Sequence, residues 1–254
     1  MNILQPALRQ LLTYMGDDAL ILGHRNSEWT GLGPVMEEDI AFSSMAQDKI
    51  GHAWALYRIL QEHLGGTDPA AFAFLRPAEK YTCCHLVEQP IGSYDFSLVR
   101  HFLFDQAEMA RYDALADSTF IPLQQLARKI KGELKYHTLH ADAWMIQLGQ
   151  AGEEGHARLQ AALEEAMPLA LGIFEPLPDQ QALIDDGIFP GEAALQQSWW
   201  ERISPVIAAA GLQTLPLADI PPAYGGRLGW HTEHLAPLLD EMGAVFRLDP
   251  HATW

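Results

Sequence analysis

Two short segments each place a histidine where a carboxylate-bridged di-iron site would hold one. In such sites two helices each carry a Glu-x-x-His pair, and two further helices each add one carboxylate. The segment AQDKIGHA contains His52, but Lys49 stands three residues before it. The segment ELKYH contains His137, but Leu134 stands three residues before it. Both histidines are therefore in place, and both paired glutamates are replaced.

Lone carboxylates precede these two segments at similar distances. Asp18 lies 31 residues before the first replaced position, and Asp105 lies 29 residues before the second. The similar offsets indicate two pseudo-equivalent halves, each made of two helices. Asp17 and Glu108 lie within one turn of the chosen acids, so a shifted helix register would select them instead.

The two replaced positions are the ones that matter most for iron. The glutamate of each Glu-x-x-His pair commonly bridges both metal ions and neutralises their charge. A lysine ammonium offers three donors and no acceptor, so iron would repel it. We expect Lys49 to take the electrostatic place of the metal instead, with its charge between Asp18 and Asp105 inside the bundle.

Glu133 offers an alternative ligand in the second half. It lies four residues before His137, so both share one helix face and Glu133 could replace the missing carboxylate with altered geometry. It could equally be an exposed residue beside Lys129 or Lys131. Three hypotheses follow: a working di-iron centre, a single adventitious metal ion, or a metal-free polar core. The sequence favours the metal-free core.

A second histidine pair occurs in the segment GWHTEHLAPLLDEM. His231 and His234 flank Glu233 at a spacing that could bind zinc. The simpler interpretation is a helix start, at which Thr232 or His231 satisfies free backbone amides.

The two cysteines and three of the tryptophans are expected to have packing roles. Cys83 and Cys84 are the only cysteines, too few and too close for a disulfide framework, and we expect small buried side chains near a helix end. We expect Trp144 and the pair Trp199–Trp200 in the core, with a protein interface as the alternative for an exposed pair.

The elements that must position these residues are helices, because apolar residues recur with helical spacing through most of the chain. The prediction is an all-α, ferritin-like four-helix bundle with additional C-terminal helices, built as a single domain over residues 1–254. The bundle core is expected at about residues 5–150, and the additional helices at about 153–254. The expected helices span residues 6–25, 37–64, 95–117, 123–148, 153–175, 193–210 and 231–246, with a long connection at 67–92.

Composition narrows the possible partners and compartment. The chain of 254 residues carries 33 acidic and 16 basic residues, a formal net charge of -17. Such a surface repels polyanions, so nucleic acid and anionic membranes are not expected as partners. No run approaches the roughly 20 apolar residues of a membrane span, and no secretory leader is expected at the N-terminus. These features predict a cytoplasmic protein.

Four blocks, in order along nearly the whole chain, carry a family resemblance: EWTGLGPVMEEDIAFSSMAQDKIGHA, LVEQPIGSYDF, ELKYH and GGRLGWHTEHLAPLLDEM. With these blocks the chain resembles the C-subunit family of the bacterial ring-1,2-phenylacetyl-CoA epoxidases, which are multicomponent monooxygenases of aerobic phenylacetate degradation. The resemblance implies a non-catalytic, ferritin-like subunit that pairs with a homologous catalytic A subunit. It further implies that the A subunit holds the di-iron centre and that a reductase with FAD and an iron-sulfur cluster supplies electrons from NADPH. No cofactor is then expected in this chain.

Three hypotheses of function remain at this stage. The first is a scaffold subunit that supports the catalytic subunit and other oxygenase components. The second is a self-sufficient ferritin-like oxidase that uses the candidate ligands Asp18, His52, Asp105, Glu133 and His137. The third is a free-standing helical binding protein, which would be a monomer that co-purifies with no oxygenase component.

Overall fold

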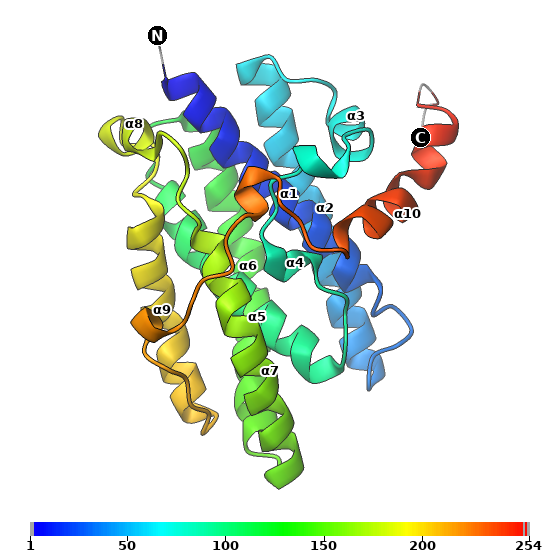
Figure 1. Cartoon of the computed structure of the whole chain (residues 1–254), viewed down its shortest axis with the longest axis vertical. Helices are drawn as coiled ribbons and strands as arrows, with labels where there is room; N and C mark the ends of the chain where they lie inside the picture. The colour runs from blue at the N-terminus through cyan, green and yellow to red at the C-terminus, as the bar shows by residue number, and fades with distance from the viewer. Residues whose placement is uncertain (1–2, 251, 253–254) are drawn as a thin grey trace. The chain divides into compact units, whose positions relative to one another are not determined.

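The computed structural model describes residues 3–250 and 252. In these residues the chain forms ten α-helices and four short 3-10 helices, and no strand, which confirms the predicted all-α class (Figure 1). The chain divides into two compact units. Unit 1 comprises Met1–Pro90 and Gly225–Trp254, and unit 2 comprises Ile91–Tyr224. The single domain over residues 1–254 stays a prediction.

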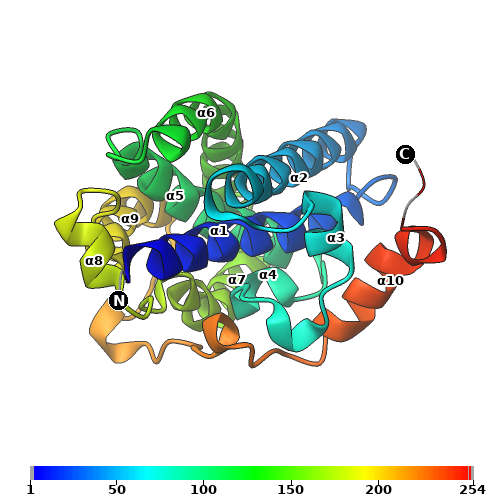
Figure 2. The same ribbon diagram turned by 90° about the horizontal axis from the view of Figure 1, so that it is seen from above.

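Unit 1 is built on two long helices that lie side by side, α1 (Leu4–Ser27) and α2 (Met36–Leu64) (Figure 2). Three acidic residues in the first turn of α2 complement the positive end of the helix dipole. The helix ends at Gly65, which has a positive φ of 67° and so adopts the left-handed conformation that stops many helices. The rest of unit 1 consists of α3 (Pro69–Phe74), η1 (Ala78–Lys80), α4 (His85–Glu88), η4 (Gly226–Leu228) and α10 (Leu235–Leu248).

Unit 2 is built around α5 (Tyr94–Leu115), which packs against α6 (Ile121–Gly149), α7 (Glu153–Leu171) and α9 (Glu192–Ala209). Every residue of α5 from Phe96 to Tyr112 is buried, polar residues included. Trp199 of α9 is completely buried, and its indole Nε1 donates a hydrogen bond to the Leu103 carbonyl at 2.9 Å. The packing role predicted for Trp199 is therefore confirmed. Unit 2 also contains η2 (Gly172–Phe174), α8 (Gln180–Asp185) and η3 (Leu217–Asp219).

Most helix boundaries lie within three residues of the predicted ones, with three corrections. The fifth helix ends at Leu171 and continues as η2, and the short helix α8 was not expected. The last helix begins at Leu235 rather than at His231. Its expected first residues, His231 and Thr232, instead form hydrogen bonds with Glu88, which hold them outside helical geometry.

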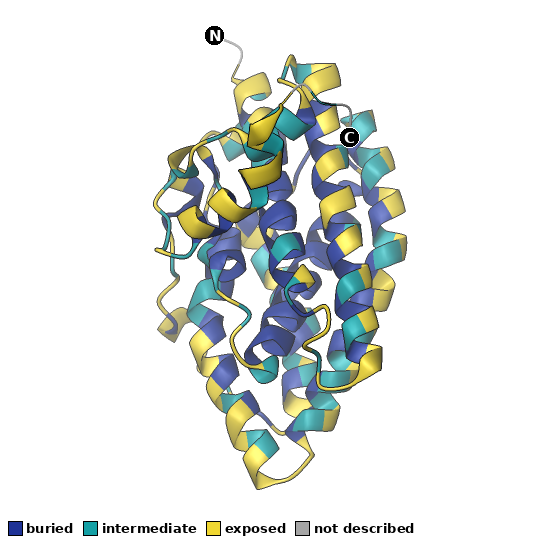
Figure 3. Cartoon of the chain, turned by 90° about the vertical axis from the view of Figure 1, so that its right-hand side faces the viewer, coloured by how far each residue is buried: buried dark blue, intermediate teal, exposed yellow. Residues whose placement is uncertain are grey.

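The long helices α2, α6 and α7 bury one side and expose the other, whereas α5 is buried on all sides from Phe96 to Tyr112. Figure 3 shows the buried residues in dark blue and the exposed ones in yellow. Cys83 and Cys84 are both buried, directly before and at the N-cap of α4, as predicted. Within the part of the chain that the structure describes, no helix is both long and apolar enough to cross a membrane.

Candidate degenerate metal centre

Asp18 of α1 is buried and pairs with an arginine. Arg227 donates from Nη1 to Oδ1 at 2.8 Å and from Nη2 to Oδ2 at 2.7 Å, and the Cys84 backbone N–H donates to Oδ1 at 2.8 Å. A bidentate arginine–carboxylate pair of this kind is strong and geometrically specific. Arg227, which spacing did not single out, therefore supplies the positive charge beside Asp18.

Asp17, the neighbouring acid, is also buried and hydrogen-bonded. It accepts hydrogen bonds from the Tyr57 hydroxyl at 2.6 Å, from the guanidinium of Arg76, and from the backbone N–H and hydroxyl of Thr82 at 2.8 and 3.0 Å. Burial, together with the charge of Asp17, raises the pKa of Tyr57 well above its ordinary value, so Tyr57 stays a hydroxyl donor. A shift of the helix register would therefore not expose a freer carboxylate.

Lys49 and His52 lie on α2, and both are buried. Lys49 is 0% exposed, so its ammonium does not lie in solvent. His52 is 3% exposed. Lysine offers no carboxylate, so the position of Lys49 cannot supply an acid that bridges two metal ions.

The second half of the predicted centre lies in unit 2. Asp105 on α5 and His137 on α6 are completely buried, with 4.0 Å between Asp105 Oδ2 and His137 Nδ1. Leu134, also on α6, is 0% exposed and packs as an ordinary core residue. Glu133 is only half-buried.

Two further histidines, which the spacing argument missed, extend this cluster: His101 contacts the carboxylate, and His140 contacts His101. His101 Nδ1 contacts Asp105 Oδ2, and His140 Nδ1 lies 3.3 Å from His101 Nε2. Burial lowers the pKa of His101, and the charge of Asp105 only partly opposes this. A sequence signal existed, because His101 lies four residues before Asp105 and His140 lies three residues after His137, spacings that share a helix face.

A separate cluster in unit 1 joins Cys83, Glu88 and His231, whose candidate ligand atoms lie within 4.8 Å of one another. His231 Nδ1 is 2.7 Å from Glu88 Oε1, and His231 Nε2 is 3.0 Å from the Tyr81 carbonyl oxygen. Each ring nitrogen of His231 therefore lies at hydrogen-bond distance from an oxygen atom, one of Glu88 and one of Tyr81.

Glu88 is the centre of that cluster. It also accepts hydrogen bonds from the Thr232 backbone N–H at 2.7 Å and from the Thr232 hydroxyl at 2.6 Å. Burial alone would raise the pKa of Glu88, but the hydrogen bonds from His231 and Thr232 outweigh it and lower the pKa. The zinc spacing noted for His231 and His234 is not realised among the described residues, since His234 is not part of this group.

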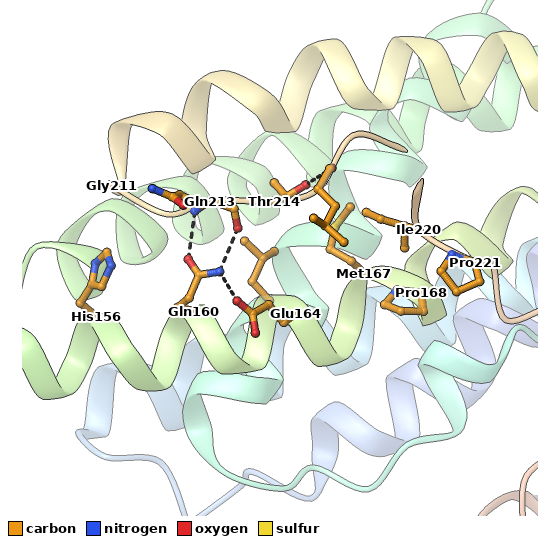
Figure 4. Close-up of a pocket in the computed structure, with 12 residues that line it drawn as sticks. His156, Gln160, Glu164, Met167, Pro168, Gly211, Gln213, Thr214, Ile220 and Pro221 are labelled. Carbon is orange, nitrogen blue, oxygen red and sulfur yellow. Dashed lines mark hydrogen bonds between the residues drawn. The ribbon is translucent and has the colours of Figure 1, made fainter. Parts of the chain in front are cut away.

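A hollow lies elsewhere in unit 2, between α7 and the segment 211–221 (Figure 4). Its volume is about 710 Å³, and its walls are formed by apolar residues such as Met167 and Ile220 beside polar residues. The side-chain amide of Gln160 accepts from the Gln213 N–H at 2.9 Å and donates to the Gln213 carbonyl at 2.9 Å, as the dashed lines show. No predicted site residue lines this hollow.

Comparison with known proteins decides the family. A family model described as "Phenylacetic acid catabolic protein" matches residues 2–254. The chain belongs to this family. It is also 29% identical over 252 residues to the C subunit of 1,2-phenylacetyl-CoA epoxidase from Escherichia coli (strain K12), an alignment that covers 97% of this chain and all of the relative. The resemblance and the ferritin-like class expected from the sequence are thereby shown.

For this member of the phenylacetic acid catabolic family, the donor set does not fit two bridged iron ions. Leu134 offers no ligand atom, and Lys49, which is also completely buried, offers no carboxylate. Both oxygens of Asp18 face the guanidinium of Arg227. A di-iron site needs carboxylates that bridge the metal ions, and neither replaced position can supply one.

Proposed function

We propose that this chain is the non-catalytic structural subunit of a phenylacetyl-CoA epoxidase that works in the cytoplasm. In this role it pairs with the catalytic A subunit and supports it, while the di-iron centre belongs to the A subunit and a reductase supplies electrons. The observation that carries the proposal is the pair Lys49 and Leu134, both fully buried at the two positions that should bridge iron. The similarity to the C subunit of an epoxidase over 97% of the chain supports it.

The scaffold proposal gives the buried ion pairs a physical role. An ancestral metal would have held opposing carboxylates together, and in its absence those charges need other partners. Arg227 does this for Asp18, and Arg76 does it for Asp17. A helical subunit of this kind can keep its shape without metal and can offer a fixed surface to a partner.

The proposal is tested by expressing the chain alone, the catalytic subunit alone, and the two together. We expect the two chains to co-purify and the pair to epoxidise phenylacetyl-CoA when reductase, NADPH and oxygen are supplied. We expect no turnover from this chain without the catalytic subunit. Oxygen-dependent turnover by this chain alone would refute the scaffold role.

The competing oxidase hypothesis makes a different prediction for His52. If His52 were a ligand, His52→Ala would abolish turnover while assembly remained intact. Under the scaffold proposal, the same substitution changes stability or pairing and leaves the iron content of the partner unchanged. Iron analysis of the purified pair, alongside its thermal unfolding curve, separates the two.

A further inference from the structure

One face of unit 1 exposes an unusual number of large apolar side chains. Seventeen large hydrophobic residues are exposed in the part of the chain that the structure describes, and six of them fall between positions 32 and 54. We call these six residues the α2 face: Leu32, Val35, Met36, Ile40, Ile50 and Trp54. Exposed apolar patches of this kind mark interaction sites more often than scattered single residues do.

The α2 face also has no exposed charged residue between Ile40 and Trp54. From Ile40 to Trp54 the exposed residues of α2 are Ile40, Ser44, Gln47, Ile50, Gly51 and Trp54. None is charged, although the whole chain has a net charge of -17. The cores of protein interfaces are likewise depleted of charged residues and enriched in aromatic residues and Met.

Gly51 in the middle of this face has no explanation within the chain. A Cβ added there would meet nothing within 4 Å, so no internal packing requires glycine. Glycine in an exposed helix interior costs about 1 kcal/mol relative to alanine. A partner helix that approaches closely beside Trp54 would account for it.

A surface hollow of about 430 Å³ opens on the same face, lined by Thr30, Gly31, Asp39, Ile40, Ser43, Ser44 and Gln47. The hydroxyls of Thr30 and Ser43 lie 2.8 Å apart. Asp39 is the one charged residue of the lining, and its Oδ1 accepts from the Gly33 N–H at 2.6 Å. The hollow therefore suits a long side chain that ends in a hydrogen-bond donor or a cation.

We propose that the α2 face is the docking site for the catalytic subunit, an inference that rests on the function proposed above. The partner presents an apolar helix face with one Lys or Arg that enters the hollow and faces Asp39. A second copy of this chain suits the face less well, because it would bring another net charge of -17 against the first. The helical part of the face, from Met36 to Trp54, is about 27 Å long, which is long enough for the apolar core of a standard interface of roughly 800 Å² per partner.

The test compares two tryptophan substitutions in unit 1. Trp54 is 48% exposed on the α2 face, and Trp230 is 71% exposed outside it. We expect Trp54→Glu to raise the Kd for the catalytic subunit at least tenfold and Trp230→Glu to leave it within about twofold. Ser44→Trp, which fills the hollow, should also raise the Kd, and circular dichroism checks that all three variants fold.

Three other outcomes would contradict the proposal, each in a different way. A wild-type Kd for Trp54→Glu and Ser44→Trp, or equal loss with Trp230→Glu, would overturn the docking site and leave the proposed function intact. A wild-type chain that does not bind the catalytic subunit at all would refute the proposed function as well. A homodimer of the isolated chain that Trp54→Glu dissociates would assign the face to a second copy instead.

Discussion

The two halves of the predicted centre, one in each unit, neutralise their carboxylates in different ways. In unit 1, Asp17 and Asp18 face arginines, which stay charged at any physiological pH. In unit 2, Asp105 faces His101 and, at 4.0 Å, His137. One half therefore holds permanent ion pairs, and the other keeps groups whose charge can change.

This difference concerns the residues available at each half of the predicted centre. Unit 1 has Lys49 at the position predicted for a bridging acid, and Arg227 occupies the carboxylate oxygens of Asp18. Unit 2 has Leu134 at the other predicted position and holds two buried imidazoles, His101 and His137, beside Asp105. The arginine half therefore depends most on its ion pairs, and the histidine half on its packing.

The largest effect is expected from Arg227→Ala in unit 1. It removes one partner of a buried pair and leaves Asp18 without its bidentate donor, which should cost about 4 kcal/mol of unfolding free energy. The measurement is urea denaturation at neutral pH. Arg247→Ala, which breaks the exposed pair with Asp240, is the control and should cost less than about 1 kcal/mol. Equal losses of unfolding free energy for the two variants would show that the buried Arg227–Asp18 pair stabilises the fold no more than an exposed pair does.

Leu134→Ala is expected to have the next largest effect and acts in unit 2. Leu134 is completely buried, so its truncation loses transfer free energy and opens a cavity, at about 3 kcal/mol. Leu139→Ala on the same helix is the control, because Leu139 is 69% exposed and should change stability by less than about 0.5 kcal/mol. Thermal unfolding compares them, and a Leu134→Ala variant as stable as Leu139→Ala would show that the replaced position is not part of the core.

Glu88→Gln should cost about 2 kcal/mol at neutral pH, because it weakens charge-assisted hydrogen bonds from His231 and Thr232. The pKa of Glu88 is lowered in the folded state, so its stabilisation is complete above the unfolded-state pKa of about 4.3 and is lost as the pH falls further. The gap in stability between wild type and Glu88→Gln should therefore narrow below about pH 4. Denaturation curves from pH 7 to pH 3 check this. A difference in stability between the two proteins that stays constant over this range would contradict a lowered pKa of Glu88 in the folded state.

His140→Ala should have the smallest effect. His140 is half-buried and contacts His101 at 3.3 Å, so its loss should cost less than about 1 kcal/mol. NMR titration of the His101 ring should still show a shift, since a neighbouring imidazole has been removed. An unchanged His101 resonance would mean that the two rings are not coupled.

The helices were predictable because their signals are local. Apolar periodicity and the flanking Gly and Pro located the long helices to within a few residues. The start of α10 was misplaced because the contact that excludes His231 from the helix comes from Glu88, 143 residues earlier in the chain. No local pattern contains that information.

The candidate residues were predictable as buried positions, but their partners were not. Spacing located Asp18, Lys49, His52, Asp105 and His137, all of which are buried. Arg227 lies 209 residues from Asp18, so only the folded chain shows their pairing. His101 and His140 could have been found by extending the same helical spacing to every histidine near Asp105.

The central claim is that this chain holds no di-iron centre of its own. The direct test is the iron content of the isolated chain, expressed with ample ferrous iron and measured by elemental analysis beside the catalytic subunit treated in the same way. The account predicts iron well below one ion per copy of this chain, with iron bound by the catalytic subunit. Two iron ions per copy of this chain, together with the spectroscopic signature of a coupled pair, would contradict it.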